Sequence, residues 1–333
     1  MDPALDAIRL DFEPASLLAL NIILALLMFG VALDLRLSDF RAVAKAPRGP
    51  LVGIATQLLL LPPATFLLVQ LIDPIPSVAL GMMLIAACPG GNVSNFLVWL
   101  AKGNAALSVS MTAVTSTAAM FMTPFNLTFW AALDPDTRRL LADIAVDPVI
   151  MVITILLILA LPLLAGMWTG SRYPEFAARM RRPLRVAGGL FFLSFIVLAF
   201  WRDREYLTLA ILPVLGIVAA HNALALTLGY TAARLTGLSA RDRRAVTIEV
   251  GIQNSGLGLA LIFTFFAGLG GMAIVAAWWG SWHIVGGLTL AALWSRRDPG
   301  DYRDDHRDDG RDDGRDDGRG DGRGDGPGRA GSD

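Results

Sequence analysis

Residues 88–95 read CPGGNVSN and interrupt a long apolar segment that extends from residue 77 to residue 101. Proline removes a helical hydrogen-bond donor and clashes with the preceding turn, and paired glycines add backbone freedom. The whole segment is nevertheless long enough to cross a bilayer, which takes about 20 mostly apolar residues. We therefore expect a membrane-spanning helix that is broken near its middle.

A second apolar segment, residues 245–266, is interrupted in the same way. Its residues 249–256 read EVGIQNSG, so a carboxylate, two amides and two glycines fall inside it. Glu249 is the only acidic residue that we expect deep within a membrane span. Because polar groups at membrane depth are costly, they usually face a cavity or a transport pathway.

The rest of the chain is as apolar as these two segments. Of its 333 residues, 54% are hydrophobic and only 17% are charged, against about 25% in ordinary soluble domains. This composition excludes an ordinary soluble domain, the single cysteine excludes a disulfide scaffold, and no basic face suggests nucleic-acid binding. The expected fold class is an all-α polytopic membrane protein with nine transmembrane helices at residues 15–33, 49–72, 77–101, 104–133, 145–169, 186–201, 206–233, 245–266 and 271–294.

The two broken helices are the third and the eighth spans, so they should cross the membrane in opposite directions. Broken helices at corresponding positions of opposed halves indicate an inverted-repeat secondary transporter. The two halves would be residues 15–133 and 145–295. The unwound centres would offer backbone carbonyls to a cation and N–H groups to an anion, since irregular backbone is tolerated at depth only where it lines a cavity.

Loop charges predict the orientation. The loops after the first, third, fifth and seventh spans carry 14 Lys and Arg, against 5 in the N-terminus and the other loops. The positive-inside rule therefore places residues 1–14 outside and the C-terminus in the cytoplasm of a protein of the cell inner (plasma) membrane. Residues 298–333 hold 7 Arg and 13 Asp in Arg-Asp-Asp-Gly repeats, so the cytoplasmic tail 296–333 is expected to be disordered.

Several oxygen-bearing side chains can accompany Glu249. Oxygen ligands suit a hard cation such as Na⁺. Two pairs have the i, i+4 spacing that places both members on one helix face. Hydroxyls can instead bond to their own helix carbonyls, and an amide can form an interhelical hydrogen bond, so these alternatives stay open. The candidates are Gln253 at i+4 from Glu249, Ser94 and Asn95 at the other break, Ser108 with Thr112, and Gln57.

These motifs resemble the bile acid:sodium symporter family between about residues 22 and 294. The most specific matches are residues 88–91 with Ser94 and Asn95, and residues 247–257; weaker ones are residues 28–30 with 37–40, 103–109 and 282–283. The resemblance implies a panel domain and a core domain, with two discontinuous helices that cross at their unwound centres. It also implies nine helices here, one fewer than the ten of bacterial members with known folds.

The resemblance carries over the family's sodium sites residue by residue. The first would use Ser94, Asn95, Ser108, Thr112 and Glu249, and the second Gln57, Glu249 and Gln253 with carbonyls of Val250 and Ile252. The substrate region would include Gly91, Asn92, Asn254 and His283. Asn92 stands where we expect Thr, and Ile284 follows His283 where a family member has Asn. The resemblance therefore leaves the identity of the substrate open, whereas the sodium-ligand positions hold the residue types of the family.

The sequence thus predicts a sodium-coupled symporter of an organic anion, bile-acid-like or a small carboxylate such as pantoate, that works by alternating access. Its partners would be Na⁺, the anion and the lipid bilayer, with no nucleic acid and no bound cofactor. An H⁺-coupled carrier or exporter on the same scaffold, with Glu249 as the protonated group, is one alternative. A non-transporting membrane receptor is another. We expect no enzyme, because no nucleophile or metal constellation is present.

Overall fold

A computed structural model describes residues 35–91, 93–144, 149–150, 153, 156–202, 204–297 and 299, together with residues 6, 22, 25, 26, 28–30, 32 and 33. Residues 1–299 form one compact unit, and the description concerns this unit alone. Several expectations lie outside the described residues: the N-terminal segment 1–14, most of the first span, the start of the fifth span, Asn92 and the tail beyond residue 299.

Helices and no strand make up the part of the chain that the structure describes. The chain begins there with α3 (Leu37–Lys45), α4 (Arg48–Ala55), the π-helical turn η1 (Thr56–Leu60) and α5 (Leu61–Ile72). It continues with α6 (Pro76–Ala87), α7 (Val93–Leu100), α8 (Ala105–Leu133), α9 (Pro135–Ile144), the π-helical turn η2 (Leu156–Ala160) and α11 (Leu161–Arg172). It ends with α12 (Pro174–Arg202), α13 (Arg204–Leu235), α14 (Ala240–Gly251), α15 (Ser255–Phe265) and α16 (Gly270–Ser295).

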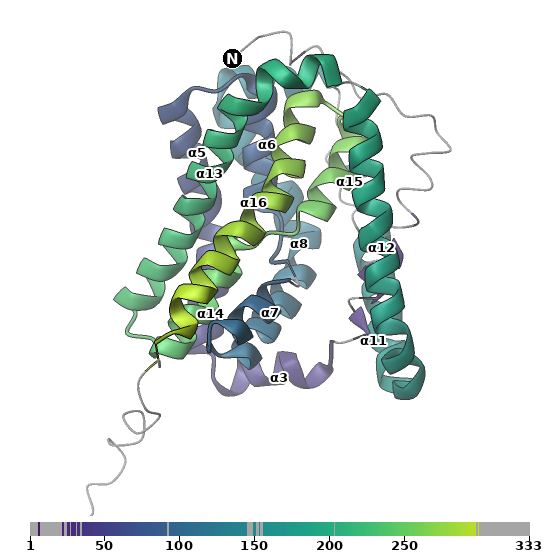
Figure 1. Ribbon diagram of the computed structural model, residues 1–333, viewed down its shortest axis with the longest axis vertical. Helices are drawn as coiled ribbons and strands as arrows, with labels where there is room; N and C mark the ends of the chain where they lie inside the picture. The colour runs from purple at the N-terminus through teal and green to yellow at the C-terminus, as the bar shows by residue number, and fades with distance from the viewer. Residues whose placement is uncertain are drawn as a thin grey trace, which may run out of the picture. The chain divides into compact units, whose positions relative to one another are not determined.

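Both expected breaks are present. The first separates α6 from α7 and the second separates α14 from α15. Gly90 and Gln253, one from each break, form an antiparallel bridge, so the two interrupted helices meet at their breaks. In Figure 1, α6 and α15 lie toward one end of the bundle and α7 and α14 toward the other.

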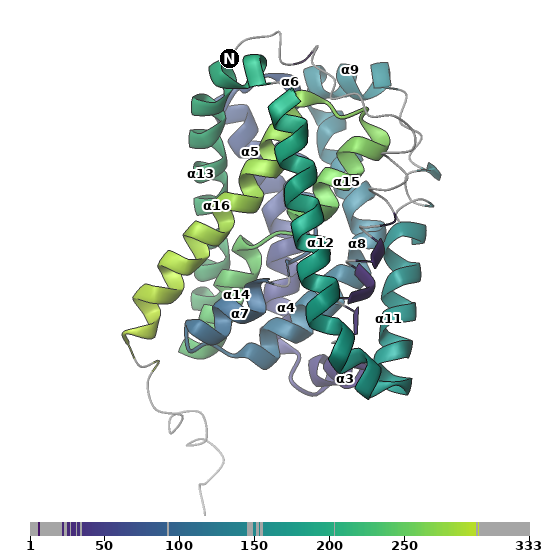
Figure 2. The same cartoon turned by 45° about the vertical axis from the view of Figure 1, so that its right-hand side comes forward.

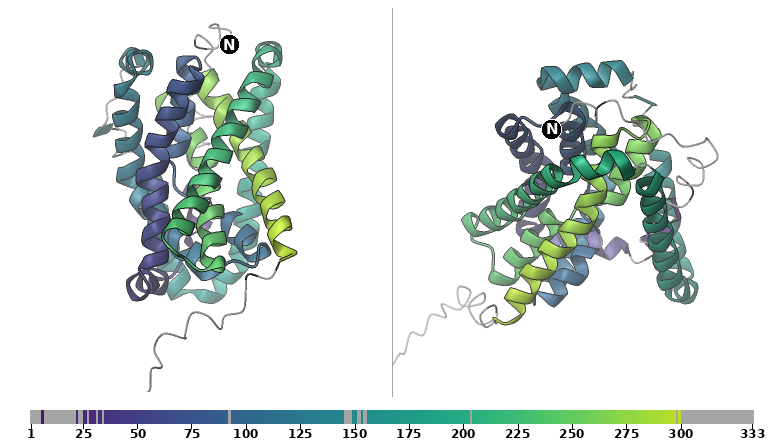
Figure 3. Two further views of the ribbon diagram at one scale, coloured as in Figure 1. Left: turned by 90° about the vertical axis from the view of Figure 1, so that its left-hand side faces the viewer. Right: turned by 45° about the horizontal axis from the view of Figure 1, so that its top comes forward.

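The core is built around helix α6. All of its residues from Ser77 to Ala87 are buried, so this helix presents no face to its surroundings. Helix α6 packs against α5, α8 and α16, and α14 packs against α13 and α8. Figure 3 shows the helix from Arg48 to Ile72 running alongside α13, with which it is also in contact. Helices α11 and α12 pack against each other, and Figure 2 brings α12 to the front.

Among the residues that the structure describes, four helices are long and apolar enough to cross a membrane: Arg48–Ile72, Ala105–Leu133, Pro213–Leu235 and Gly270–Ser295. Helices α6 and α15 are apolar but shorter, because each is one half of an interrupted element. The protein is therefore an all-α, multi-pass membrane protein.

One segment differs from expectation. The arginine-rich stretch before the sixth span was expected to be a loop, but α12 starts at Pro174 and continues through the expected span 186–201 to Arg202. Proline is favoured in the first helical turn, Glu175 there complements the helix dipole, and arginine is a good helix former. Pro183 lies inside the helix without ending it.

Candidate transport site

The two breaks are joined by backbone hydrogen bonds. The Gly91 N–H donates to the Ile252 carbonyl at 2.8 Å, and the Asn254 N–H donates to the Pro89 carbonyl at 2.8 Å. Carbonyl and N–H groups left over where a helix stops must find partners when they are buried. Each break therefore supplies hydrogen-bond partners to backbone groups of the other, and these bonds fix the point where the two helices cross.

The carboxylate of Glu249 is fully buried at this crossing. Its Oε2 atom accepts hydrogen bonds from the hydroxyls of Ser94 at 2.5 Å and Ser108 at 2.6 Å. Its Oε1 atom accepts a hydrogen bond from the hydroxyl of Thr112. Two helices, α7 and α8, thus place hydroxyl oxygens around the carboxylate that α14 carries.

Asn95 extends this oxygen cluster. Its Oδ1 atom accepts hydrogen bonds from Ser108 Oγ at 2.8 Å and from Thr112 Oγ1 at 3.4 Å. Thr112 Oγ1 also lies 3.0 Å from the Ser108 carbonyl oxygen of its own helix, the back-bonding alternative raised by the i, i+4 spacing, so three acceptors share its single hydroxyl proton. The structure therefore brings Ser94, Asn95, Ser108, Thr112 and Glu249 into one hydrogen-bonded group.

No positively charged side chain of the described residues forms an ion pair with Glu249, whose hydrogen-bond partners are hydroxyls. A buried charge that lacks an opposite charge is costly, and hydrogen bonds alone compensate only part of the desolvation. The hydrogen-bond partners of the carboxylate are all oxygens, the ligands preferred by hard cations. This arrangement can hold a small cation next to the carboxylate.

Gln57 and Gln253 form a hydrogen-bonded pair of amides next to this oxygen cluster. The Gln57 Nε2 atom donates to Gln253 Oε1 at 3.0 Å, and Gln253 Nε2 donates to the Val250 carbonyl at 2.9 Å. The other polar atom of Gln57, Oε1, is buried and has no partner in the described structure. Buried oxygens are normally paired, so this acceptor is available to a further donor or a cation.

The backbone that carries Gln57 is a π-helical turn, which the sequence analysis did not foresee. The Leu61 N–H bonds to the Thr56 carbonyl five residues earlier. Pro62 has no N–H to offer the Leu58 carbonyl, and the Nδ2 atom of Asn126 on α8 donates to it instead at 3.0 Å. A Pro-Pro pair five residues after a buried glutamine is the signal that could have indicated this turn.

Side chains also cap the first halves of both interrupted helices. Thr123 on α8 donates to the Ala87 carbonyl at the end of α6, at 2.7 Å. Asn222 on α13 donates to the Gly251 carbonyl at the end of α14, also at 2.7 Å. Helix ends leave carbonyls without intrahelical partners, so these contacts stabilise the breaks. Thr123 was not identified from sequence, because nothing local marks a residue that caps a distant helix.

Two of the residues expected to bind substrate, Gly91 and Asn254, form hydrogen bonds within the protein instead. The Gly91 N–H, expected to face a substrate carboxylate, is occupied by the Ile252 carbonyl. Asn254 Oδ1 accepts the Leu257 N–H at 3.0 Å as the N-cap of α15, while its Nδ2 atom lies 4.0 Å from Met28 Sδ. His283 is buried on α16, its ring 6.5 Å from that of Trp279, and its Nδ1 atom is unpartnered among the described residues.

Comparison with known proteins supplies a second line of argument. The model of the sodium bile acid symporter family matches residues 21–210. The uncharacterized sodium-dependent transporter YocS of Bacillus subtilis is 30% identical over 278 residues, which cover 84% of this chain and 83% of the relative. The probable sodium/metabolite cotransporter BASS1 of Arabidopsis thaliana, chloroplastic, is 28% identical over 84% of this chain and 68% of its own. The human ileal sodium/bile acid cotransporter is 30% identical over 72% of this chain and 67% of its own.

Proposed function

Because the chain belongs to the sodium bile acid symporter family, we propose that it is a sodium-coupled symporter that carries an organic anion across the membrane. Relatives with names of sodium-dependent transporters, sodium/metabolite cotransporters and bile acid cotransporters support the sodium coupling. The proposed substrate class is a carboxylate, either bile-acid-like or small and pantoate-like.

The observation that carries the proposal is the buried, uncompensated carboxylate of Glu249 among oxygen atoms. One Na⁺ would bind Ser94, Asn95, Ser108, Thr112 and Glu249. A second would bind Gln57, Glu249, Gln253 and the carbonyls of Val250 and Ile252. The unpartnered Oε1 of Gln57 supports the second site, because Na⁺ would supply the missing partner. Sodium is cargo in this reaction, and we propose no bound cofactor.

Two sodium ions next to one carboxylate give the site a net positive charge, which favours an anionic substrate. The side chains of Asn254 and His283 would contact it, and we propose Asn92 as a third contact. The Gly91 N–H would become available only if its bond to Ile252 opened. Sodium binding would hold the crossing geometry and so raise the affinity for the anion, which is a coupling free energy.

The architecture that fits this function has nine membrane spans arranged as a panel and a core. Residues 15–133 and 145–295 would be the inverted halves, with the N-terminus outside and the tail 296–333 in the cytoplasm. Rocking of the panel against the core would expose the crossing alternately to the two sides. The inner membrane is the proposed location. We propose no enzymatic role, since the family is a family of transporters.

The test uses purified protein and a panel of organic acids. Thermal unfolding is measured in NaCl and in KCl, without acid and with each acid in turn. The proposal expects a higher unfolding midpoint in NaCl, a further rise with one class of carboxylate, and loss of both effects in Glu249→Gln. Sodium-driven uptake of the same acid into proteoliposomes then separates a symporter from a receptor, which would bind without flux. Equal midpoints in NaCl and KCl, with uptake that follows a proton gradient instead, would overturn sodium coupling.

A further inference from the structure

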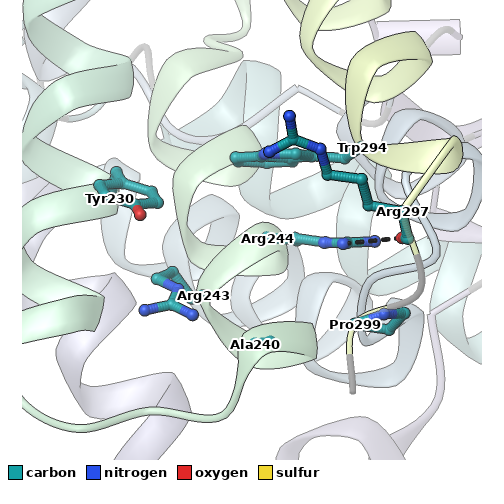
Figure 4. Close-up of a pocket in the computed structure, with 7 residues that line it drawn as sticks. All are labelled: Tyr230, Ala240, Arg243, Arg244, Trp294, Arg297 and Pro299. Carbon is teal, nitrogen blue, oxygen red and sulfur yellow. Dashed lines mark hydrogen bonds between the residues drawn. The ribbon is translucent and has the colours of Figure 1, made fainter.

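A cavity of about 210 Å³ lies at the end of the helix bundle where α13 and α16 finish and α14 begins. Three arginines and two aromatic rings line it: Arg243, Arg244, Arg297, Tyr230 and Trp294, with Ala240 and Pro299 completing the wall. It shares no lining residue with the crossing of the interrupted helices. Figure 4 shows the guanidinium groups of all three arginines around this space.

The aromatic rings hold two of the arginines in place. The Arg243 guanidinium lies 5.5 Å from the Tyr230 ring centroid, and the Arg244 guanidinium lies 5.8 Å from that of Trp294. The two rings are stacked with their centroids 6.5 Å apart. A stacked guanidinium loses less side-chain freedom when it binds an anion, so this cluster is arranged in advance.

Arg244 differs from the other two arginines because it is structural. It is buried, and it donates to the Ala101 carbonyl at 2.7 Å and to the Arg297 carbonyl at 3.0 Å. Arg243 is half-buried and Arg297 is exposed, and neither forms an ion pair with a described residue. Arg297 extends back toward Trp294 in Figure 4. Two guanidinium groups are thus left to contact a ligand.

We propose that this cavity binds the phosphate group of an anionic ligand. Guanidinium groups present a planar fork of donors that matches phosphate oxygens, and several arginines around one space favour a multiply charged oxyanion. A water occupies about 30 Å³ of liquid, so the space accommodates a phosphate with a few further atoms. The binding group is therefore a phosphate that carries a small substituent.

Two ligands share this chemistry. Tyr230 and Trp294 lie in the last two turns of membrane helices, where amphipathic aromatic residues meet the lipid headgroups. Basic pockets between helices at that depth bind anionic phospholipid headgroups. A soluble phosphate ester would present the same group from the aqueous side. Binding of either ligand would join the ends of α13 and α16 to the start of α14, the helix that carries Glu249.

The experiment uses the full-length purified protein in an uncharged detergent. Its thermal unfolding midpoint is followed as a function of the concentration of dioctanoyl phosphatidylglycerol, dioctanoyl phosphatidylcholine or glycerol 3-phosphate. The variants are Arg243→Gln and Arg297→Gln. Arg241→Gln is the matched control, because Arg241 is an exposed arginine of the same helix that does not line the cavity. Arg244 is left unchanged because of its structural contacts.

The proposal expects saturable stabilisation by at least one of the two anionic probes. Each cavity variant should weaken the apparent affinity for the anionic probe about fivefold, which corresponds to the free energy of one arginine contact at a membrane surface. Arg241→Gln should leave the affinity unchanged. A response to phosphatidylglycerol alone identifies a lipid site, and a response to glycerol 3-phosphate identifies a soluble ligand. Stabilisation by phosphatidylcholine to the same extent, equal affinity in all three variants, or no response to either anionic probe overturns the proposal.

Discussion

Gly90 and Glu249 approach so closely that a methyl group on Gly90 would lie 2.5 Å from the Glu249 Oε1 atom. It would also lie 3.4 Å from Gln57 Nε2. The carboxylate and the buried amide therefore meet over Gly90, one of the two glycines of the break. The restriction is one of space, because the backbone of Gly90 does not adopt a positive φ angle.

Gly90→Ala should consequently displace the Glu249 carboxylate. We expect the apparent Na⁺ affinity to fall by about tenfold or more. Changes that move a metal ligand, or a residue that supports one, usually lower metal affinity by this factor. The measurement is the sodium dependence of thermal unfolding. Gly216→Ala is the control, because a Cβ there has no atom within 4 Å, and it should leave the sodium response unchanged. Unaltered sodium affinity in Gly90→Ala would show that the carboxylate is not a sodium ligand.

Glu249→Gln should remove the sodium response completely. The substitution keeps the shape of the side chain and an acceptor for the hydroxyls, but it removes the charge that both proposed sodium sites share. Sodium-driven uptake and sodium-induced stabilisation are measured together. Glu175→Gln, an exposed carboxylate in the first turn of α12, is the matched control. A variant that keeps one of the two proposed sodium sites would contradict the shared role of Glu249.

Asn126→Leu should weaken sodium binding without touching a proposed ligand. The change leaves the Leu58 carbonyl without a partner and should cost about 1–3 kcal/mol of stability. Because this carbonyl belongs to the turn that carries Gln57, sodium affinity should fall about tenfold as well. Thr128→Ala on the same helix is the control, since Thr128 donates only within its own helix. A loss of stability alone would give Asn126 a purely structural role.

Asp134→Asn tests a carboxylate outside the membrane spans. Burial raises the pKa of Asp134, but hydrogen bonds from the Thr137 amide and hydroxyl, the Gln70 side chain and the Asp136 amide lower it below its ordinary value overall. A lowered pKa in the folded state stabilises the protein above the ordinary carboxyl range, and this contribution is lost as the pH falls through the folded-state value.

Asparagine caps a helix as well as aspartate does, so this substitution isolates the charge at the start of α9. The wild type should be more stable than the variant at pH 7 by about 0.3–1 kcal/mol, the usual value for a charge at a helix end. The difference should shrink as the pH falls below the ordinary carboxyl range, as measured by thermal unfolding at a series of pH values. A difference that stays constant with pH would mean that the charge of Asp134 contributes nothing.

The helical class, the two breaks and the composition of the oxygen cluster could all be predicted from the sequence. The helical class, the breaks and the helix faces are local features, whereas the grouping of residues from α7, α8 and α14 in one cluster is not. Proline and glycine mark a break wherever they occur in an apolar run, and an i, i+4 spacing such as that of Ser108 and Thr112 defines a helix face. The roles of Glu249, Gln57 and the substrate residues stay predictions that the sodium and uptake measurements address.

Tertiary structure alone decided how the atoms at the crossing are used. It assigned the Gly91 N–H to Ile252 and the Asn254 side chain to the cap of α15, and it brought Asn126 to the carbonyl that Pro62 leaves free. Each of these contacts joins groups whose partner is set by the packing of the surrounding chain. A buried donor or acceptor must be satisfied, but the sequence does not say by which group, because that depends on which helices the whole fold brings together.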